Sequence, residues 1–228
     1  MIAMAFALAA ASDAKPVRSV DLYVTPLYSS AAKASKRVVR VDPDLDPLLR
    51  SDRTEDVLAA QERVRANPAK VSPLALMVLA ARLYDVGARD ESVFWFYVAK
   101  DRFMAMAGVL SGYDRPGMFA EGGEARAAMG AFVQLAGPTI NGYAFCKIDN
   151  QQALRRKAYD WVAANPYQPI FDTARPAKGE DRQALLDAAL ARLREDMAKE
   201  TAYLADAENR AKLIAGRKEN GADTRFCW

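Results

Sequence analysis

The sequence predicts an all-α protein, an irregular helical bundle with one repeat-like helical hairpin and a long C-terminal amphipathic helix. Apolar residues recur at helical spacings of three and four from residue 46 onward. Residue pairs typical of helix ends, such as Asn-Pro, interrupt this pattern about once per helix length. The chain is 51% apolar and 27% charged, which indicates a folded protein with a sizeable core. We expect residues 46–228 to form a single helical domain.

Residues 1–14 have the character of a secretory signal peptide. The first 11 residues are uncharged and apolar, and Ser12 and Ala14 are small residues at the spacing that signal peptidase accepts for a cut after Ala14. The run has no preceding basic residue and is short, so an apolar helix packed on the domain is the alternative. No stretch reaches 18 uninterrupted apolar residues, and we expect no transmembrane segment.

Residues 15–45 form a basic, irregular segment. Between residues 15 and 40 the only acid is Asp21, against six lysines and arginines. This segment is a candidate contact surface for acidic partners, and a solvated arm is the alternative. The stretches SVDLYV and RVVRV within it could pair as two short strands.

The first helix is expected over residues 46–66. Asp46 and Pro47 supply a helix start, and Asp52 with Glu55 has the spacing of a capping box. The helix should end at Asn67, because a residue before proline is displaced from the α region.

Two further helices, 73–86 and 90–110, are predicted to form an antiparallel pair around a turn at Gly87. Ser72 and Asp90 are the expected caps. Four consecutive aromatic residues, 94–97, lie in the second helix and cannot share one face, so this helix should be covered on two sides.

Residues 73–100 resemble one helical hairpin of the tetratricopeptide or Sel1-like repeats. Ala80 stands where that family prefers glycine and Ser92 where it prefers alanine, and no second copy is evident. The resemblance implies a second hairpin face that contacts a neighbour. The residues that carry it are Leu79, Ala80, Leu83, Gly87, Asp90, Glu91, Ser92, Phe96 and Ala99.

Two further helices are expected over residues 120–136 and 149–165, with a short segment over 137–146 between them and a proline-rich loop over 166–179 after them. From residue 180 to about 217 one long amphipathic helix is predicted. Its apolar stripe consists of Leu186, Leu190, Leu193, Met197, Thr201, Leu204, Ala211 and Ile214.

The two cysteines, Cys146 and Cys227, fit an exported protein. In an oxidising compartment such a pair forms a disulfide, worth about 4–5 kcal/mol in the chain-entropy model. It would hold the C-terminus, where Phe226 and Trp228 are expected to be packing anchors. We therefore predict a periplasmic or secreted protein, with a cytoplasmic one containing two reduced thiols as the alternative.

No catalytic, cofactor or metal motif is evident. The chain contains no histidine, which excludes Ser-His-Asp and Cys-His catalysis and HExxH zinc sites. Glu121 and Glu124 are weak candidates for a general acid/base pair, although acids in the first turn also stabilise a helix electrostatically. We expect no cofactor and no metal. A net charge of only +3 gives no general electrostatic argument for nucleic acid, and we do not expect it as a partner.

The leading prediction is an exported, non-enzymatic helical module that binds another protein. An immunity or inhibitor protein and an envelope scaffold would both fit. An envelope hydrolase or lyase that uses Glu121, Glu124 or Asp149 near the loop 111–124 is the alternative, and a carrier with an aromatic-lined pocket is a third hypothesis. The predicted partner-binding residues are Phe94, Trp95, Tyr97 and Arg102.

Overall fold

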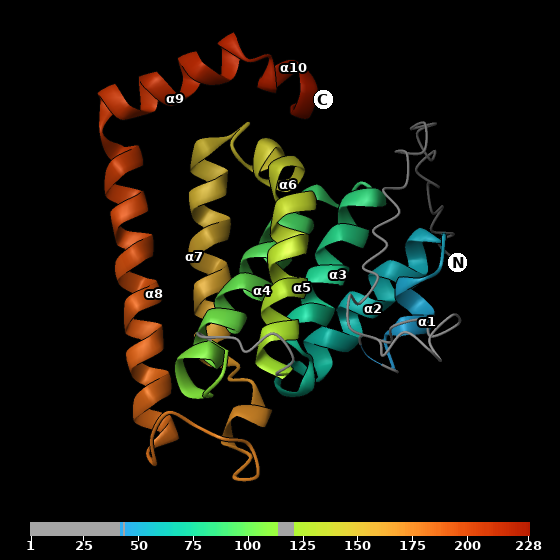
Figure 1. Ribbon diagram of the computed structural model, residues 1–228. Helices are drawn as coiled ribbons and strands as arrows, with labels where there is room; N and C mark the ends of the chain where they lie inside the picture. The colour runs from blue at the N-terminus through green and yellow to red at the C-terminus, as the bar shows by residue number, and fades with distance from the viewer. Residues whose placement is uncertain (1–41, 43, 114–120) are drawn as a thin grey trace, which may run out of the picture.

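The computed structural model describes residues 42, 44–113 and 121–228, and this part of the chain is helical with no strand (Figure 1). The predicted all-α fold is confirmed. The predicted signal peptide, the basic segment up to residue 41 and the two short strands lie outside the described residues. The helices are α1 (Asp46–Leu49), α2 (Thr54–Ala66), η2 (Pro68–Lys70), α3 (Pro73–Asp85), α4 (Arg89–Val109), α5 (Glu121–Leu135), α6 (Gly137–Ala144), α7 (Ile148–Ala164), η3 (Gln168–Phe171), α8 (Arg182–Ala205), α9 (Ala207–Glu219) and α10 (Ala222–Phe226).

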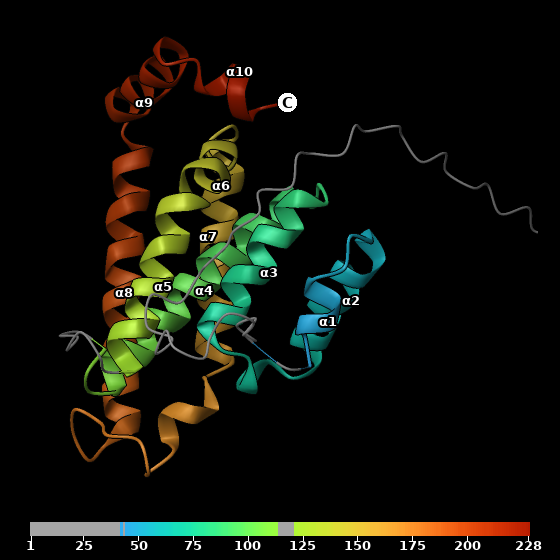
Figure 2. The same cartoon turned by 45° about the vertical axis from the view of Figure 1, so that its right-hand side comes forward.

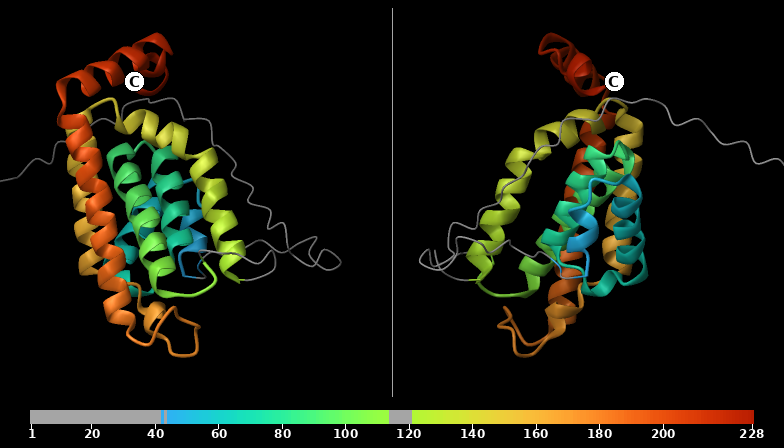
Figure 3. Two further views of the ribbon diagram at one scale, coloured as in Figure 1. Left: turned by 60° about the vertical axis from the view of Figure 1, so that its left-hand side comes forward. Right: turned by 90° about the vertical axis from the view of Figure 1, so that its right-hand side faces the viewer.

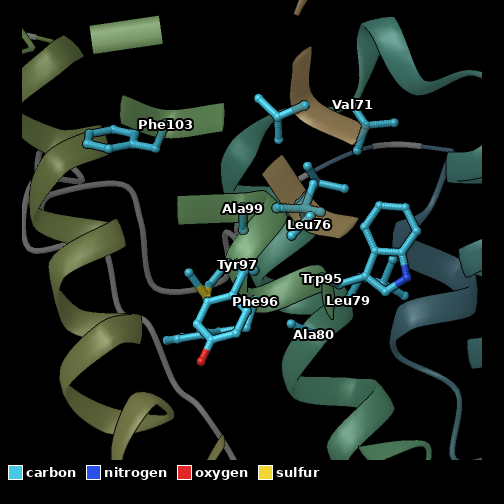
Figure 4. Close-up of a cluster of buried hydrophobic side chains, with 14 of the residues drawn as sticks. Val71, Leu76, Leu79, Ala80, Trp95, Phe96, Tyr97, Ala99 and Phe103 are labelled. Carbon is cyan, nitrogen blue, oxygen red and sulfur yellow. The ribbon is translucent and has the colours of Figure 1, made fainter. Parts of the chain in front are cut away.

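Helix α4 is the centre of the bundle. It packs against α3, α6, α7 and α8, which surround it (Figures 1 and 3). All four side chains of the aromatic run 94–97 are buried, and Trp95 and Tyr97 point to different sides of α4 (Figure 4). A helix that is apolar all round must be covered all round. The prediction that this helix is covered on two sides is confirmed.

The α3–α4 hairpin closes at Gly87. This residue has φ 84°, which favours glycine, and the N–H of Ala88 donates to the carbonyl oxygen of Leu83 at 2.9 Å. Along the seam, the Ser92 hydroxyl donates to the carbonyl oxygen of Ala80 at 2.7 Å. This bond satisfies a buried hydroxyl between two closely packed helices. The resemblance of this hairpin to tetratricopeptide or Sel1-like repeats stays a prediction.

The helix expected over residues 46–66 is divided, so that prediction was wrong in one respect. Helix α1 ends at Leu49 and α2 begins at Thr54, with Arg53 in an extended conformation as N-cap. The Arg82 guanidinium donates to the carbonyl oxygen of Ser51 at 2.8 Å and fixes the intervening turn. The N-cap of α2 is therefore Arg53, and the predicted capping box at Asp52 and Glu55 is not formed.

The long C-terminal helix is also divided. Helix α8 ends at Ala205, Asp206 is extended, and its carboxylate accepts from the N–H of Asn209 at 2.9 Å as the N-cap of α9. Helix α9 turns across the end of the bundle and does not continue along α7 (Figure 3). Leu204 is buried, but Ile214 is half exposed, so the predicted apolar stripe ends at the break. The capping strength of aspartate explains a break that the spacing of apolar residues did not indicate.

Candidate partner-binding groove and the C-terminal disulfide

The predicted partner-binding residues lie in the core. Phe94, Trp95, Tyr97 and Arg102 are all buried, with Trp95 fully inaccessible. The Trp95 ring packs edge-on against Trp161 of α7, with centroids 5.1 Å apart. Side chains without accessible surface cannot contact a partner on this fold, so we correct the prediction: these residues build the core, and partner binding must use another surface.

Arg102 has an internal role. One terminal nitrogen, Nη1, donates to the carbonyl oxygens of Pro68 at 2.6 Å and Val71 at 2.9 Å, while Nη2 donates to that of Asn165 at 2.6 Å. The guanidinium also lies over the Trp161 ring, 4.7 Å from its centroid. Burial lowers the pKa of Arg102 to about 10. The side chain is therefore still charged at neutral pH and joins η2 to the end of α7.

A buried polar layer joins α4, α7 and α8. The amide of Gln151 donates to the Tyr97 hydroxyl at 3.0 Å and to a carboxylate oxygen of Glu200 at 2.8 Å. Arg155 forms an ion pair with the buried Asp101. Desolvation raises the pKa of Asp101 and raises that of Tyr97 to about 12. The members of this layer satisfy one another, which is how helix interfaces accommodate polar groups.

Of the three carboxylates proposed for catalysis, the structure describes the side chain of Asp149. The side chains of Glu121 and Glu124 lie outside the described residues. Asp149 is exposed and accepts two hydrogen bonds from Arg210, at 2.8 and 3.0 Å, which lower the pKa of that carboxyl. A carboxylate held ionised in this way is poorly suited to donate a proton. Among the described residues, no cluster of histidine, cysteine, aspartate or glutamate side chains could hold a metal ion.

The predicted disulfide is present between Cys146, which follows α6, and Cys227, which follows α10. Their Cα atoms are 5.6 Å apart. The bond fixes α10 on the end of α6 (Figures 1 and 2). At Gly142 of α6, any Cβ would lie within 2.5 Å of the Phe226 ring, so the two helices are in close contact. The C-terminus is thereby attached to a part of the bundle that is 81 residues away in sequence.

An apolar groove lies beside this attachment. It has a volume of about 230 Å³ between α3, the α5–α6 corner and α10. Leu135 and Trp228 are 60% and 68% exposed, which is high for large apolar side chains. The residues that line the groove are Ala81, Tyr84, Asp85, Leu135, Ala136, Thr139, Ile140, Arg225, Phe226 and Trp228.

Trp228 is the groove residue for which the sequence-based prediction needs correction. It was expected to be a packing anchor, but its ring lies on the surface over the Arg89 guanidinium, 4.1 Å from the ring centroid. Arg89 also donates to the carbonyl oxygen of Trp228. Phe226, by contrast, does pack on α6. The position of Trp228 beside the disulfide was a signal for this surface, but nothing in the sequence indicated that Leu135 would line the same groove.

Within the described residues, no helix combines the length and apolar character that a membrane crossing needs. No family model and no solved structure matches the chain.

The chain is similar to a protein of Haemophilus influenzae that bears the description "Uncharacterized protein". The two are 35% identical over 214 residues, which are 94% of this chain and 81% of the relative. The similarity therefore extends over nearly all of the chain and most of the other protein. The chain belongs to the same family as this Haemophilus influenzae protein.

Proposed function

We propose that the protein is an exported, non-enzymatic helical module that binds another protein through the groove between α3, α5, α6 and α10. The observation that carries this proposal is the exposure of two large apolar side chains, Leu135 and Trp228, on the rim of one apolar groove. Single exposed apolar residues are ordinary, but a group of them around a hollow is typical of an interaction site.

The size of the groove favours a protein partner over a small ligand. Ligand pockets usually have volumes of about 300–1,000 Å³, and this groove has about 230 Å³. A space of this size suits one or two anchoring side chains of a partner. Aromatic residues such as Trp228 and Tyr84 are enriched at the points of such interfaces that contribute most to binding. An immunity or inhibitor protein and an envelope scaffold both fit this description.

The repeat-like hairpin contributes to the proposed interface through its first helix. Ala81, Tyr84 and Asp85 of α3 form one wall of the groove, whereas α4 is enclosed by other helices. The second hairpin face that the resemblance implies would therefore be on α3. The C-terminal residues Phe226 and Trp228 form the facing wall.

The disulfide supports the exported location. Such bonds persist in oxidising compartments and are rare in the cytoplasm. The intact mass of the protein from its native cells tests this part of the proposal. A chain that begins at Lys15 and gains about two hydrogens on reduction is the expected result. A full-length chain with free thiols would contradict export.

Photo-crosslinking in native cells tests the groove. The photoreactive amino acid p-benzoylphenylalanine is introduced at Leu135 and, as a matched control, at Leu58 of α2, which is 41% exposed and does not line the groove. We expect an adduct of defined mass from position 135 and none from position 58. The absence of an adduct at 135, or the same adduct at both positions, would contradict the proposal.

The interaction can then be measured directly with the partner identified in the adduct. Leu135→Asp places a charge on the rim of the groove, and we expect it to weaken binding at least tenfold, because a partner that covers this residue would bury the charge without a counter-ion. Leu58→Asp is the control and should leave the affinity unchanged. Unchanged affinity of Leu135→Asp would show that the partner binds elsewhere.

A further inference from the structure

The disulfide is open to reagents from two sides. One hollow of about 560 Å³ is lined by Cys146, Asp149, Arg210 and Arg217, and a second of about 440 Å³ by Asp90, Cys146, Cys227 and Trp228. Cys227 itself is exposed. Structural disulfides are usually enclosed, whereas exposed ones are typically the labile or regulatory ones. A thiolate could reach this bond without unfolding of the bundle.

A buried cation lies against both sulfur atoms. Arg217 of α9 is only 9% exposed, and its Nη2 is 3.3 Å from Cys227 Sγ and 3.6 Å from Cys146 Sγ. The same nitrogen donates to the carbonyl oxygen of Gly142 at 3.0 Å, and Nε donates to Asp223 at 2.9 Å. The bond to Gly142 does not involve the C-terminal tail, so the guanidinium can remain beside Cys146 after the disulfide opens.

A guanidinium in this position stabilises a thiolate. Neighbouring arginine or lysine residues increase the thiolate fraction of a cysteine, and the stability of the leaving thiolate speeds disulfide exchange. An intact disulfide carries no charge that would require such a partner. The arrangement is therefore suited to the opened state of the bond.

We propose that Cys146–Cys227 is a reversible thiol–disulfide exchange site whose reductant is a dithiol, such as that of a thiol oxidoreductase. A thiolate of the dithiol attacks the exposed Cys227 Sγ and forms a new S–S bond. The Cys146–Cys227 bond breaks, and its electron pair leaves on Cys146 Sγ beside Arg217. The second thiolate then displaces Cys227, so two electrons pass to the protein and the dithiol becomes a disulfide.

The exchange site also controls the groove, and this second part rests on the proposed function. Cys227 lies between Phe226 and Trp228, which form one groove wall. Without the disulfide, the tail keeps only non-covalent contacts: Phe226 with α6, Trp228 with Arg89, and Asp223 with Arg217. Reduction should therefore loosen α10 and dismantle that wall.

The reactivity of Cys146 tests the chemical part. In Cys227→Ser the thiol of Cys146 is permanently free and the tail has no covalent attachment. The rate of its alkylation by iodoacetamide at pH 7 is compared with that of Cys227→Ser/Arg217→Met. We expect removal of the guanidinium to slow alkylation about tenfold, because the thiolate is the reactive form.

Two variants serve as controls for this comparison. Cys227→Ser/Arg217→Lys should recover part of the rate, and Cys227→Ser/Arg225→Met should match Cys227→Ser. Equal or faster alkylation without Arg217 would overturn the proposal.

Hydrogen exchange tests the control of the groove without any partner. The amides of residues 222–226 should exchange faster after reduction with dithiothreitol and alkylation, while those of α4 should not change. Unchanged exchange in α10 would refute this control. Loss of the crosslink at position 135 on reduction would support it, whereas failure of all crosslinking would contradict only the proposed function.

Discussion

At the scale of the residue, the clearest case is a charged side chain that the fold uses inside its core. Arg102 is 1% exposed and satisfies three backbone carbonyl groups at places where regular helix is interrupted. The carbonyl group of Val71 is buried and those of Pro68 and Asn165 are half-buried, and a buried carbonyl group that loses its donor is costly in free energy. The sequence suggested a surface residue, because arginine is almost never fully buried unless it is paired.

Arg102→Met should therefore lower the free energy of unfolding by about 3 kcal/mol, since one buried and two half-buried acceptors lose a charged donor. Arg102→Lys should recover only part of this, because lysine lacks the planar fork that reaches several acceptors at once. Urea denaturation measures both. Arg156→Met, on the exposed face of α7, is the control and should stay within about 0.5 kcal/mol. A loss for Arg102→Met no larger than that of the control would show that these hydrogen bonds contribute little.

At the scale of the element, the position of α10 depends on its contact with α6. Gly142 permits this contact because the Phe226 ring occupies the space that a Cβ would fill. Gly130 of α5 provides a matched comparison, since a Cβ there would meet nothing within 4 Å. The two glycines are both helical and differ in their surroundings.

Gly142→Ala should lower the free energy of unfolding by about 1–3 kcal/mol, the usual cost of overpacking, and should speed hydrogen exchange in α10. Gly130→Ala should raise it by up to about 1 kcal/mol, because alanine favours helix. Chemical denaturation of the oxidised proteins distinguishes these results. Similar stabilisation by both substitutions would mean that α10 moves away from α6 at no cost.

The break between α8 and α9 is the second element-scale feature that determines where the C-terminus goes. Asp206→Ala removes the N-cap of α9, and we expect a loss of about 1 kcal/mol in denaturation. Continuation of α8 would also carry Cys227 away from Cys146, so reoxidation of the reduced variant should be slower. Glu195→Ala, which changes an exposed acid in the interior of α8, is the control. Unchanged stability and reoxidation would show that the break is set by packing instead of by the cap.

At the scale of the whole molecule, the sequence predicted which helix would be buried, but it did not predict where the apolar groove would lie on the surface. The aromatic run 94–97 required a covered central helix, and Gly87 required a turn, because both constraints act within one or two helices. The groove combines Leu135 with Trp228, residues from distant parts of the chain. Their proximity depends on the break at Asp206 and on the disulfide. A local sequence pattern does not show which distant residues come together on the surface. The prediction of partner-binding residues therefore relied on the conspicuous aromatic run, which is buried.

The buried polar layer between α4, α7 and α8 makes stability dependent on pH. Burial, the largest cause, raises the pKa of Tyr97 from its usual 10.0 to about 12, and the charges of Glu200 and Asp101 act in the same direction. Between these values the unfolded chain has lost the phenolic proton while the folded protein retains it. The folded state then binds more protons, so stability falls as pH rises. Lys100 has the opposite effect on stability. Burial lowers its pKa, so just below its usual pKa of 10.5 the unfolded chain binds more protons and stability rises with pH.

Tyr97→Phe isolates the contribution of the tyrosine, because Lys100 and the other tyrosines remain in both proteins. At neutral pH the variant should be less stable by about 1 kcal/mol, through loss of the hydrogen bond with Gln151. Between pH 10 and pH 12 the wild-type protein should lose up to about 2 kcal/mol relative to the variant, so the order of stability reverses. Urea denaturation at intervals across this range measures the difference. A constant difference would mean that Tyr97 ionises equally in both states, and the polar layer would then have to admit water in the folded protein.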